Sequence, residues 1–488
     1  MKTINDYVTH LKTLICDKQI SVDKEIAHVT CDSRQAKPGT LFCAIAGTVS
    51  NGHDYIESAI ANGAVAIIYS QNLEEYNPDI SYLKVKQQYL AYAMACELCF
   101  DCPVKKLRLH GITGTNGKTT TAFLLEHILN ESNLKTALIT TVECRDGNNI
   151  TPSEHTTPEA WDLQSLFRRI ADNNCHDAVM EVSSHGLDQF RPGSAKFYTA
   201  IFTNLTGDHL DYHENMDKYF AAKKHLFLHY LDKNGTAIIN IDDKYGKILA
   251  AELRQEQVIS YGQSIYADCR IVDLITSTSG TDLKLEFRGN VFIINSPLIG
   301  EYNAYNACAA FCAAVSSGVE GQAIAAALSQ KIRIPGRIEQ FRDKHGVNYF
   351  VDYAHTDDAL SNVLKNLRII ANKRIITVFG CGGNRDRTKR PRMAAAAAEY
   401  SDLLIITSDN PRSENPLDII DEIKIGVPKK IDYMIELDRE KAIKLASNAA
   451  EEGDIVLVAG KGHETYQEIN GKFFDFDDRE IITGICAS

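Results

Sequence analysis

The sequence predicts an α/β protein with three domains, of which the second and third are built on parallel sheets covered by helices. The chain of 488 residues is too long for one ordinary hydrophobic core. Apolar segments typical of strands alternate along it with segments of helical periodicity, which is the pattern of parallel sheets. We expect a small N-terminal α/β domain at 1–106, a central domain at 107–333 and a Rossmann-like C-terminal domain at 334–488.

The composition is that of a soluble globular protein, with 44% hydrophobic and 24% charged residues. The chain has 52 basic and 64 acidic residues, so its formal net charge is −12. This charge argues against nucleic acid or an anionic membrane as a partner. No apolar run is long enough to span a bilayer, and the first residues lack the pattern of a secretion signal. We therefore expect a cytoplasmic protein without a membrane span, and we take a monomer as the working expectation.

Thirteen cysteines without a secretion signal indicate a reducing compartment. Cys96, Cys99 and Cys102 follow one another at intervals of three, as in half of an iron–sulfur motif. No fourth cysteine lies nearby, and residues 91–100 have the pattern of a buried helix in which cysteine acts as a small apolar residue. We expect these thiols to be structural.

Four segments predict the N-terminal domain. Residues 27–31, 41–45 and 64–69 have the pattern of strands, and residues 55–62 have that of a helix. Ser33 and the arginine after it follow the first strand. Such a pair can hold a diphosphate or a sugar, but an ordinary polar turn is as common, and the residues alone leave both open.

A glycine-rich turn opens the central domain at 111–121, where the chain reads Gly-Ile-Thr-Gly-Thr-Asn-Gly-Lys-Thr-Thr-Thr. Residues 104–109 predict a strand before it, and apolar residues at helical spacing predict a helix from about Lys118. Backbone N–H groups at such a helix start bind phosphate. Lys118 adds a charge for the outer phosphates, and Thr119 adds a hydroxyl for Mg²⁺. The register differs from the common nucleotide loop, which has glycine where Ile112 stands.

Further strands are predicted in the central and C-terminal domains, and polar clusters follow several of them. Ligands of parallel sheets bind at the carboxyl ends of the strands, so these clusters are candidate sites. The central strands are expected at 136–142, 177–182, 197–204 and 236–241, with a hairpin at 283–295 and helices at 304–315 and 322–329. The C-terminal strands are expected at 348–352, 374–379, 403–408 and 455–459.

Six separated motifs together resemble the Mur ligase family, in the order that the family has them. The resemblance covers the chain from about Asp32 to Glu464. It implies an ATP-dependent ligase that forms an amide bond in the peptide of peptidoglycan. The motifs lie at 111–120, 181–187, 204–213, 300–303, 335–339 and 352–355.

Within the family, the motifs at 409–412 and 460–464 resemble the branch that adds meso-diaminopimelate as the third residue. The implied reaction consumes ATP. ATP phosphorylates the free carboxylate of UDP-N-acetylmuramoyl-L-alanyl-D-glutamate (UDP-MurNAc-L-Ala-D-Glu), the amino group of diaminopimelate attacks the acyl phosphate, and phosphate leaves. Mg²⁺ is the implied cofactor.

The resemblance also implies site residues. Lys118, Glu181, His209 and Lys223 would be catalytic, and Mg²⁺ would bind to Thr119, Glu181, His209 and Lys223. Lys223 matches a lysine carried as a carbamate (N6-carboxylysine), although Lys224 beside it leaves the choice open. ATP would contact Gly114, Thr115, Asn116, Gly117, Lys118, Thr119, Thr120, Asn303, Arg337 and Asp352. The nucleotide-linked dipeptide would contact Cys31, Ser33, Thr48, Val49, Ser50, Thr156, Thr157, Ser183, Gln189 and Arg191. Diaminopimelate would contact Arg385, Asp409, Asn410, Pro411, Arg412, Gly460 and Glu464.

Arg412 favours diaminopimelate over lysine as the added amino acid. The two differ by one carboxylate, which an arginine fork binds through paired hydrogen bonds. Lysine would leave the buried guanidinium without its partner, at a cost of about 1–3 kcal/mol. Without the other motifs, Arg412 would be read as a surface arginine after an Asn-Pro turn.

Three other functions stay open at this point. A ligase similar to folylpolyglutamate synthase uses the same kind of ATP loop, and a regulatory scaffold would bind ATP without joining substrates. His209 and His213 also have the spacing of zinc ligands, although no glutamate follows His209 as in metalloproteases.

Overall fold

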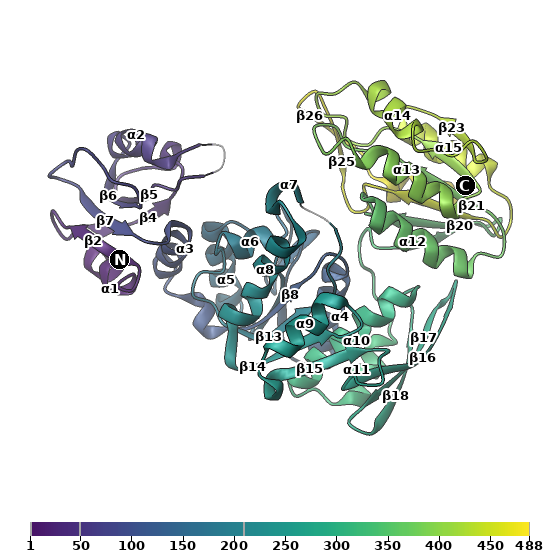
Figure 1. Ribbon diagram of the computed structural model, residues 1–488, viewed down its shortest axis with the longest axis horizontal. Coiled ribbons are helices and arrows are strands. Elements are labelled where there is room, and N and C mark those ends of the chain that lie inside the picture. The colour runs from purple at the N-terminus through teal and green to yellow at the C-terminus, as the bar shows by residue number, and fades with distance from the viewer. Residues whose placement is uncertain (1, 48–49, 208–209, 488) are drawn as a thin grey trace. The chain divides into compact units, whose positions relative to one another are not determined.

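The computed structural model describes residues 2–47, 50–207 and 210–487 (Figure 1). The chain divides into two compact units. The first contains the residues up to Tyr261 together with Ala309–Glu320, and the second contains Gly262–Cys308 and the residues from Gly321 onward. Among the helices of the described residues, none combines the length and the apolar character needed to cross a membrane.

The N-terminal part of the first unit is a five-stranded sheet, of which four strands are parallel. Successive residues of its central strand alternate between two cores. Ala66 and Ile68 face the core under α1 and α3, whereas Ile67 and Tyr69 face the core under α2. The sheet order is β2 (Ile15–Gln19), β7 (Ser81–Val85), β6 (Ala64–Tyr69), β5 (Thr40–Cys43) and β4 (His28–Thr30). The helices are α1 (Ile4–His10), α2 (Ile56–Ala61) and α3 (Gln88–Cys99), with short helices η1 (Ser33–Gln35) and η2 (Gly52–Tyr55) and a small ladder of β1 (Lys2–Thr3) and β3 (Glu25–Ile26).

The three strands and the helix predicted for this part are confirmed, and the predicted buried helix around Cys96 is α3. The strand predicted at 104–109 is wrong over its first four residues. Pro103 opens a short 3₁₀ helix, η3 (Pro103–Lys106), after Cys102, whose φ of 52° is left-handed. The following strand, β8, begins only at Arg108.

The central sheet of the first unit has the order β11, β10, β9, β12, β8, β13, β14, β15. All neighbours from β9 to β15 are parallel, which confirms the predicted type of sheet. Gly111 in β8 has a packing role, because a Cβ there would lie 2.6 Å from Cδ1 of Phe197 on β13. The strands are β8 (Arg108–Thr113), β9 (Thr136–Ile139), β10 (Glu143–Arg145), β11 (Ile150–Pro152), β12 (Asp177–Glu181), β13 (Phe197–Phe202), β14 (Leu231–Asn240) and β15 (Val258–Gly262). The helices are α4 (Lys118–Glu131), α5 (Ala160–Asp172), α6 (Ser184–Asp188), α7 (Leu210–His213), α8 (Met216–His225), α9 (Lys244–Glu252), η4 (Leu226–Tyr230) and η5 (Gln255–Gln257).

The second unit begins with an antiparallel meander of β16 (Cys269–Ser277), β17 (Gly280–Phe287) and β18 (Asn290–Ser296). The predicted hairpin is confirmed: Arg288 and Gly289 form its turn with φ values of 52° and 75°, the left-handed conformation that a two-residue hairpin turn requires. Two helices follow: α10 (Glu301–Ser316), of which the residues from Ala309 onward belong to the first unit, and α11 (Gly321–Leu328).

The C-terminal sheet has the order β19, β20, β24, β21, β22, β23, and only β19 is antiparallel to its neighbour. Helices cover both faces, so the inner strands β21, β22 and β24 are buried and largely apolar. All four predicted strands are present. The strands are β19 (Glu339–Arg342), β20 (Asn348–Asp352), β21 (Ile375–Phe379), β22 (Leu403–Ile406), β23 (Asp432–Ile435) and β24 (Ile455–Ala459), with a hairpin of β25 (Tyr466–Ile469) and β26 (Lys472–Asp475). The helices are α12 (Asp357–Ile370), α13 (Lys389–Tyr400) and α14 (Pro416–Lys424) on one face, and α15 (Arg439–Ala449) and α16 (Asp478–Ala487) on the other (Figure 1).

Candidate active site

The glycine-rich turn joins β8 to α4, as predicted. Gly114 and Gly117 have φ values of 149° and 87°, and a Cβ at Gly114 would lie 1.9 Å from Oγ1 of Thr203. Asn204, directly after β13, fixes the shape of the turn: its backbone oxygen accepts the N–H of Thr115 at 2.9 Å, and its Oδ1 accepts the N–H of Asn116 at 2.9 Å. The chain therefore crosses the carboxyl end of β8 in one defined conformation, directly before the first turn of α4.

Two lysines meet at this turn. Nζ of Lys118 donates hydrogen bonds to the carbonyl oxygens of Gly114 at 3.0 Å and Thr115 at 2.8 Å. Nζ of Lys223, on α8, donates to the same Gly114 oxygen at 2.8 Å, and the Lys223 side chain is buried. Lys224 instead forms an ion pair with Glu252. The structure thus brings Lys223, and not Lys224, to the turn.

Glu181, the last residue of β12, lies beside the first turn of α4 and is 1% exposed. Its Oε1 accepts hydrogen bonds from Oγ1 of Thr119 at 2.8 Å and from the N–H of Thr141 at 3.0 Å. A carboxylate and a hydroxyl in contact are the oxygen ligands that Mg²⁺ prefers, so the donor set fits that ion. The third expected ligand, His209, lies outside the described residues.

A chain of hydrogen bonds leads from Glu181 to a second group of predicted residues. Oγ1 of Thr157 donates to the backbone oxygen of Glu181 at 3.0 Å and accepts the N–H of Ser183 at 2.9 Å. Ser183 also caps α6, since its Oγ accepts the N–H of Gly186 at 3.0 Å. These contacts hold the carboxyl end of β12 and the start of α6 as one unit.

Arg191 completes this group. Its Nη1 donates to the backbone oxygen of Thr157 at 2.5 Å, its Nε and Nη2 donate to Oε1 of Gln189 at 3.0 and 2.9 Å, and it forms an ion pair with Glu159. The hydroxyl of Thr156 accepts a hydrogen bond from that of Thr141 at 3.0 Å. All five residues predicted for the sugar and peptide side therefore belong to one network, which ends at Glu181.

The residues predicted for the uridine diphosphate side lie in the N-terminal sheet. Cys31 and Ser33 follow β4, and the Ser33 carbonyl accepts a hydrogen bond from Nδ2 of Asn62 at 2.9 Å. The neighbouring Arg34 pairs with Asp32 at 2.8 Å and stays exposed. The carbonyl of Ser50 accepts the N–H of Gly47 at 3.0 Å. Thr48 and Val49 lie outside the described residues.

In the second unit, Arg337 and Asp352 come together. The carboxylate of Asp352 accepts the N–H groups of Ile338 and Ala354, each at 2.8 Å. Burial raises the pKa of Asp352, and the charge of Arg337 opposes the shift. Asn303, on α10, donates to the carbonyl of Ile299 at 2.8 Å.

Four polar residues gather at the carboxyl ends of β22 and β24. Nζ of Lys461 donates to Oδ1 of Asn410 and to Oε2 of Glu464, each at 3.0 Å, and Nδ2 of Asn410 donates to the same Oε2 at 2.9 Å. Burial alone would raise the pKa of Asp409, but the charges of Lys461 and Arg439 hold it below its ordinary value. Lys461 was not among the predicted residues, although it lies inside the quoted motif at 460–464.

Gly460 is required at this place. Its φ is 117°, and a Cβ would lie 2.6 Å from Oδ2 of Asp409. Gly383 is required for a similar reason, because a Cβ there would lie 2.0 Å from the carbonyl oxygen of Pro411. Arg385 is exposed on the loop between β21 and α13.

Both the backbone and the side chain of Arg412 are held by contacts with neighbouring residues. Its backbone is left-handed, with a φ of 53°, and its N–H and carbonyl bond to Glu468 and Asn470 of the β25–β26 hairpin at 3.0 and 2.7 Å. Its Nη1 donates to the carbonyl of Gly383 at 2.8 Å, and its Nε forms an ion pair with Oε2 of Glu468 at 3.0 Å. Glu468 was not predicted, because the exposed hairpin that carries it has no strong sequence pattern.

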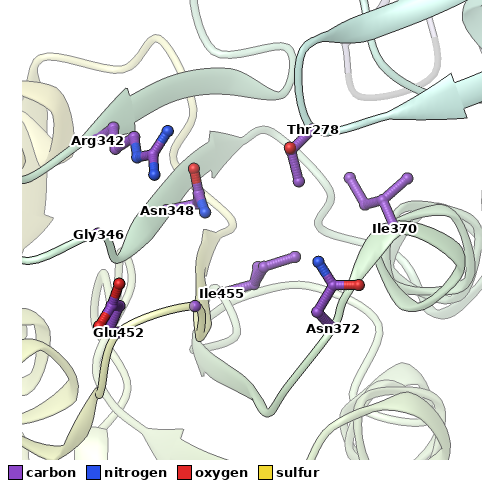
Figure 2. A pocket seen from close by; sticks show the side chains of 9 residues that line it. Thr278, Arg342, Gly346, Asn348, Ile370, Asn372, Glu452 and Ile455 are labelled. Carbon is purple, nitrogen blue, oxygen red and sulfur yellow. The ribbon is translucent and has the colours of Figure 1, made fainter.

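A cavity of ≈ 170 Å³ lies elsewhere in the second unit (Figure 2). Asn348 and Ile455, which line it, are the first residues of β20 and β24. The cavity therefore lies at the amino ends of the strands, opposite the edge that carries Asp409 and Gly460. Ligands of parallel sheets bind at the carboxyl ends, so this cavity is separate from the candidate amino-acid site.

Three family models match in order: "Mur ligase family, catalytic domain" over residues 25–95, "Mur ligase middle domain" over 112–314 and "Mur ligase, glutamate ligase domain" over 336–462. They confirm an N-terminal, a central and a C-terminal domain, while the bounds at 106 and 333 stay a prediction.

The curated relatives include proteins named UDP-N-acetylmuramoyl-L-alanyl-D-glutamate--2,6-diaminopimelate ligase. That of Solibacter usitatus is 42% identical over 462 residues, which cover 94% of this chain and 92% of the relative. Those of Geobacter sulfurreducens and Aquifex aeolicus are also 42% identical, and the matches cover 94% and 95% of this chain and 94% of each relative.

Solved structures agree. One with the same protein name is 34% identical with a TM-score of 0.68, over 96% of this chain and 97% of that one. The fold is shared with MurF of Acinetobacter baumannii, at 16% identity and a TM-score of 0.64 over 100% of this chain and 99% of that one. It is also shared with folylpolyglutamate synthase of Mycobacterium tuberculosis complexed with ADP, at 18% identity and a TM-score of 0.63 over 76% and 91%. The protein therefore belongs to the Mur ligase family, has its three-domain α/β architecture and is a ligase, as its six motifs predicted.

Proposed function

We propose that the protein joins meso-diaminopimelate to UDP-MurNAc-L-Ala-D-Glu at the expense of ATP, in the synthesis of peptidoglycan. The observation that carries the proposal is the cluster at the glycine-rich turn. Lys118 and Lys223 share the oxygen of Gly114, and the Thr119–Glu181 pair lies at the first turn of the same helix. The names of the relatives at 42% identity support the choice of substrates.

On this proposal, the phosphates of ATP bind at Gly114–Thr120. The outer phosphates attract the ammonium of Lys118 away from the carbonyl oxygens of Gly114 and Thr115, which it now contacts. Its charge then stabilises the oxygens of the transferred phosphoryl group as negative charge shifts among them. Asn303, Arg337 and Asp352 are proposed to hold adenine, phosphate and ribose respectively.

Thr119 and Glu181 are proposed to hold Mg²⁺, with His209 and a carbamylated Lys223. The ion, when bound, neutralises the phosphate oxygens and orients them for transfer. Two hydrogen bonds from Thr141 orient the carboxylate of Glu181. The hydrogen bond from Thr157 to the backbone oxygen of Glu181 further restrains that residue. Carbamylation of Lys223 would convert a cation beside the turn into an anion that binds Mg²⁺.

The network at the carboxyl end of β12 is proposed to position the nucleotide-linked dipeptide. Thr156, Thr157, Ser183, Gln189 and Arg191 would hold its sugar and peptide, while Cys31, Ser33, Thr48, Val49 and Ser50 would hold the uridine diphosphate. Holding the substrate carboxylate in line with the transferred phosphoryl group makes their reaction effectively intramolecular, which lowers its entropic cost. The connection of this network to Glu181 supports such a role.

Diaminopimelate is proposed to bind at Asp409, Asn410, Pro411, Gly460 and Glu464, with Arg385 and Arg412. The guanidinium of Arg412 is matched to the carboxylate that lysine lacks. In the absence of that carboxylate, Glu468 satisfies the guanidinium. The carboxylates of Asp409 and Glu464 carry the charge that an ammonium group requires.

The test measures phosphate release from ATP by the purified full-length chain with Mg²⁺. We expect release only with both UDP-MurNAc-L-Ala-D-Glu and meso-diaminopimelate, and a product whose mass includes both. Equal turnover with L-lysine would contradict the choice of amino acid. Turnover with a folate and glutamate would instead favour the folylpolyglutamate reaction, and binding of ATP without any turnover would favour a scaffold.

We further propose that the protein acts in the cytoplasm as a monomer. The expected substrates include ATP, which is held in that compartment. Light scattering of the purified chain should give the mass of 54.2 kDa, and a mass twice as large would contradict the monomer.

A further inference from the structure

A second group of chemically reactive side chains lies away from the phosphate-binding turn, between α1 and the end of α3. His10 is the last residue of α1, Glu97 lies in the last turn of α3, and Cys102 follows that helix. One nitrogen, one oxygen and one sulfur atom from these three residues lie within 4.8 Å of one another. Nothing in the proposed ligase reaction uses them.

The backbone after α3 directs Cys102 back toward that helix. Asp101 and Cys102 have left-handed φ values of 62° and 52°, which cost a residue other than glycine about 1–2 kcal/mol each. The N–H of Cys102 donates to the carbonyl oxygen of Glu97 at 2.8 Å, so the helix end and the turn are joined. The thiol is thereby held beside a fully buried carboxylate.

The ring of His10 is oriented like that of a metal ligand. Its Nε2 is buried and has no hydrogen-bond partner among the described residues, which costs about 1–3 kcal/mol unless a partner binds there. A ring nitrogen that is buried and without a partner is available to bind an ion.

The charges of the three side chains suit a divalent cation. A neutral imidazole, a carboxylate and a thiolate are the forms that bind Zn²⁺, which displaces the thiol proton when it binds. The carboxylate of Glu97 and the thiolate of Cys102 together would balance the two charges of the ion.

We propose that His10, Glu97 and Cys102 form a binding site for a transition-metal ion of the Zn²⁺ class. Nitrogen, oxygen and sulfur ligands together select Zn²⁺ and its neighbours, whereas Mg²⁺ and Ca²⁺ require oxygen ligands. Three protein ligands leave one position of a tetrahedral ion for water.

The position of Glu97 gives this site a structural consequence. Its carboxylate accepts the N–H of Ser194 at 3.1 Å and the Ser194 hydroxyl at 2.7 Å. Ser194 belongs to the loop after α6, three residues beyond Arg191. A metal bound to Glu97 would therefore fasten α1 and the turn after α3 to the loop that carries Arg191.

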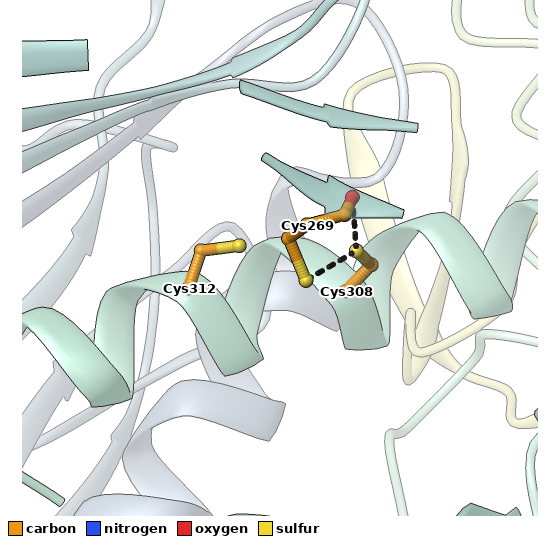
Figure 3. A group of neighbouring side chains, drawn as sticks. All are labelled: Cys269, Cys308 and Cys312. Atoms are coloured by element: carbon orange, nitrogen blue, oxygen red, sulfur yellow. Dashed lines mark hydrogen bonds between the residues drawn. The ribbon is translucent and has the colours of Figure 1, made fainter. Parts of the chain in front are cut away.

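A second thiol group provides a matched control (Figure 3). Cys308 on α10 lies with its sulfur 3.5 Å from that of Cys269 on β16, and Cys312 is one helical turn further along α10. Any metal bound to these thiols would give a similar spectrum, so substitution of Cys308 separates the two groups.

The experiment titrates the reduced, untagged full-length chain with Co²⁺ in excess Mg²⁺, which occupies sites made of oxygen ligands. We expect one equivalent of Co²⁺ to give a thiolate-to-metal charge-transfer band, and Zn²⁺ to displace it. Cys102→Ser should abolish the band, His10→Gln should weaken Co²⁺ binding about tenfold or more, and Cys308→Ser should leave both unchanged.

Three outcomes would overturn the proposal: no band in the wild-type chain, a band that persists in Cys102→Ser, or a band lost in Cys308→Ser. Circular dichroism of each variant without metal checks that it folds. If Cys102→Ser does not fold, the Co²⁺ affinity of His10→Gln tests the proposal instead, and an affinity equal to that of the wild-type chain would overturn it. Zn²⁺ should also raise the melting temperature of the wild-type chain and not that of His10→Gln.

Discussion

Lys118 and Lys223 donate hydrogen bonds to one carbonyl oxygen, that of Gly114, at 3.0 and 2.8 Å. They come from different helices, α4 and α8, and from positions 105 residues apart in the sequence. Two ammonium groups on one oxygen repel each other unless an anion binds beside them or one of them loses its charge. In the proposed reaction the triphosphate of ATP is the anion, and carbamylation removes the positive charge of Lys223.

Substitution Lys118→Ala should lower the rate of phosphate release by about 10²-fold or more, because the charge that stabilises the transferred group is lost. The measurement is steady-state phosphate release with all three substrates at saturation. Lys224→Ala is the control, since Lys224 pairs with Glu252 and should keep turnover within about twofold. Equal losses in both variants would mean that the effect is not specific to the turn.

Substitution Lys223→Ala should also abolish turnover, but a small carboxylic acid such as acetate should restore part of it. The added carboxylate would fill the space of the missing side chain and supply the anion that the proposed carbamate provides. The measurement is phosphate release against acetate concentration, with Lys118→Ala as the control that acetate does not rescue. Carbon-13 NMR of the wild-type chain in labelled bicarbonate should show one carbamate signal, and its absence would contradict the modification.

Substitution Arg412→Ala should raise the Michaelis constant for diaminopimelate about 10- to 100-fold with a smaller effect on kcat, because the partner of one carboxylate is lost. Arg387→Ala is the matched control, since that arginine pairs with Glu422 and is mostly exposed. An unchanged Michaelis constant in Arg412→Ala would exclude the proposed contact. Glu468→Gln should act in the opposite direction and lower the Michaelis constant, because the guanidinium is then less satisfied before substrate binds.

Acid should destabilise the protein partly through His463. Burial, with the charge of Arg337 as the next cause, lowers the pKa of His463 to about 3. Since the unfolded chain binds this proton near pH 6.5, the contribution of the neutral ring to stability is present above that pH and is lost as the pH falls toward 3, by at most about 1.4 kcal/mol per pH unit.

In His463→Gln, therefore, the apparent melting temperature should fall less between pH 7 and pH 4 than in the wild-type chain. Thermal scans at several pH values measure this difference. His345→Gln is the control, since His345 lies in an exposed turn between β19 and β20. Parallel curves for the wild-type chain and His463→Gln would contradict the buried neutral ring.

The sequence predicted the parts of the site that depend on local pattern. The glycine-rich turn, the helix from Lys118 and the polar ends of β12 and β13 all follow from residues close together in the chain. It could not choose between Lys223 and Lys224, because adjacent residues on a helix differ only in the face they present. Burial against the turn decides that choice, and burial depends on tertiary packing.

Features that depend on distant partners were missed. Glu468 lies in a hairpin whose residues are mostly exposed, so its strands have no buried face to produce an alternating pattern. Strand β2 was missed for the same reason, since four of its five residues are exposed. The strand predicted at 104–109 failed because Pro103 and the left-handed Cys102 impose a tight turn that apolar alternation does not reveal.

Glu468 has one more consequence for any molecule designed to occupy the pocket of Arg412. It is a competitor tethered to the chain, present at a high effective concentration however dilute the solution. An inhibitor with a carboxylate must displace it, so its measured affinity is its intrinsic affinity reduced by the fraction of chains in which the guanidinium is released. Inhibitors that also accept the displaced carboxylate of Glu468, through a second cationic group, would avoid this loss.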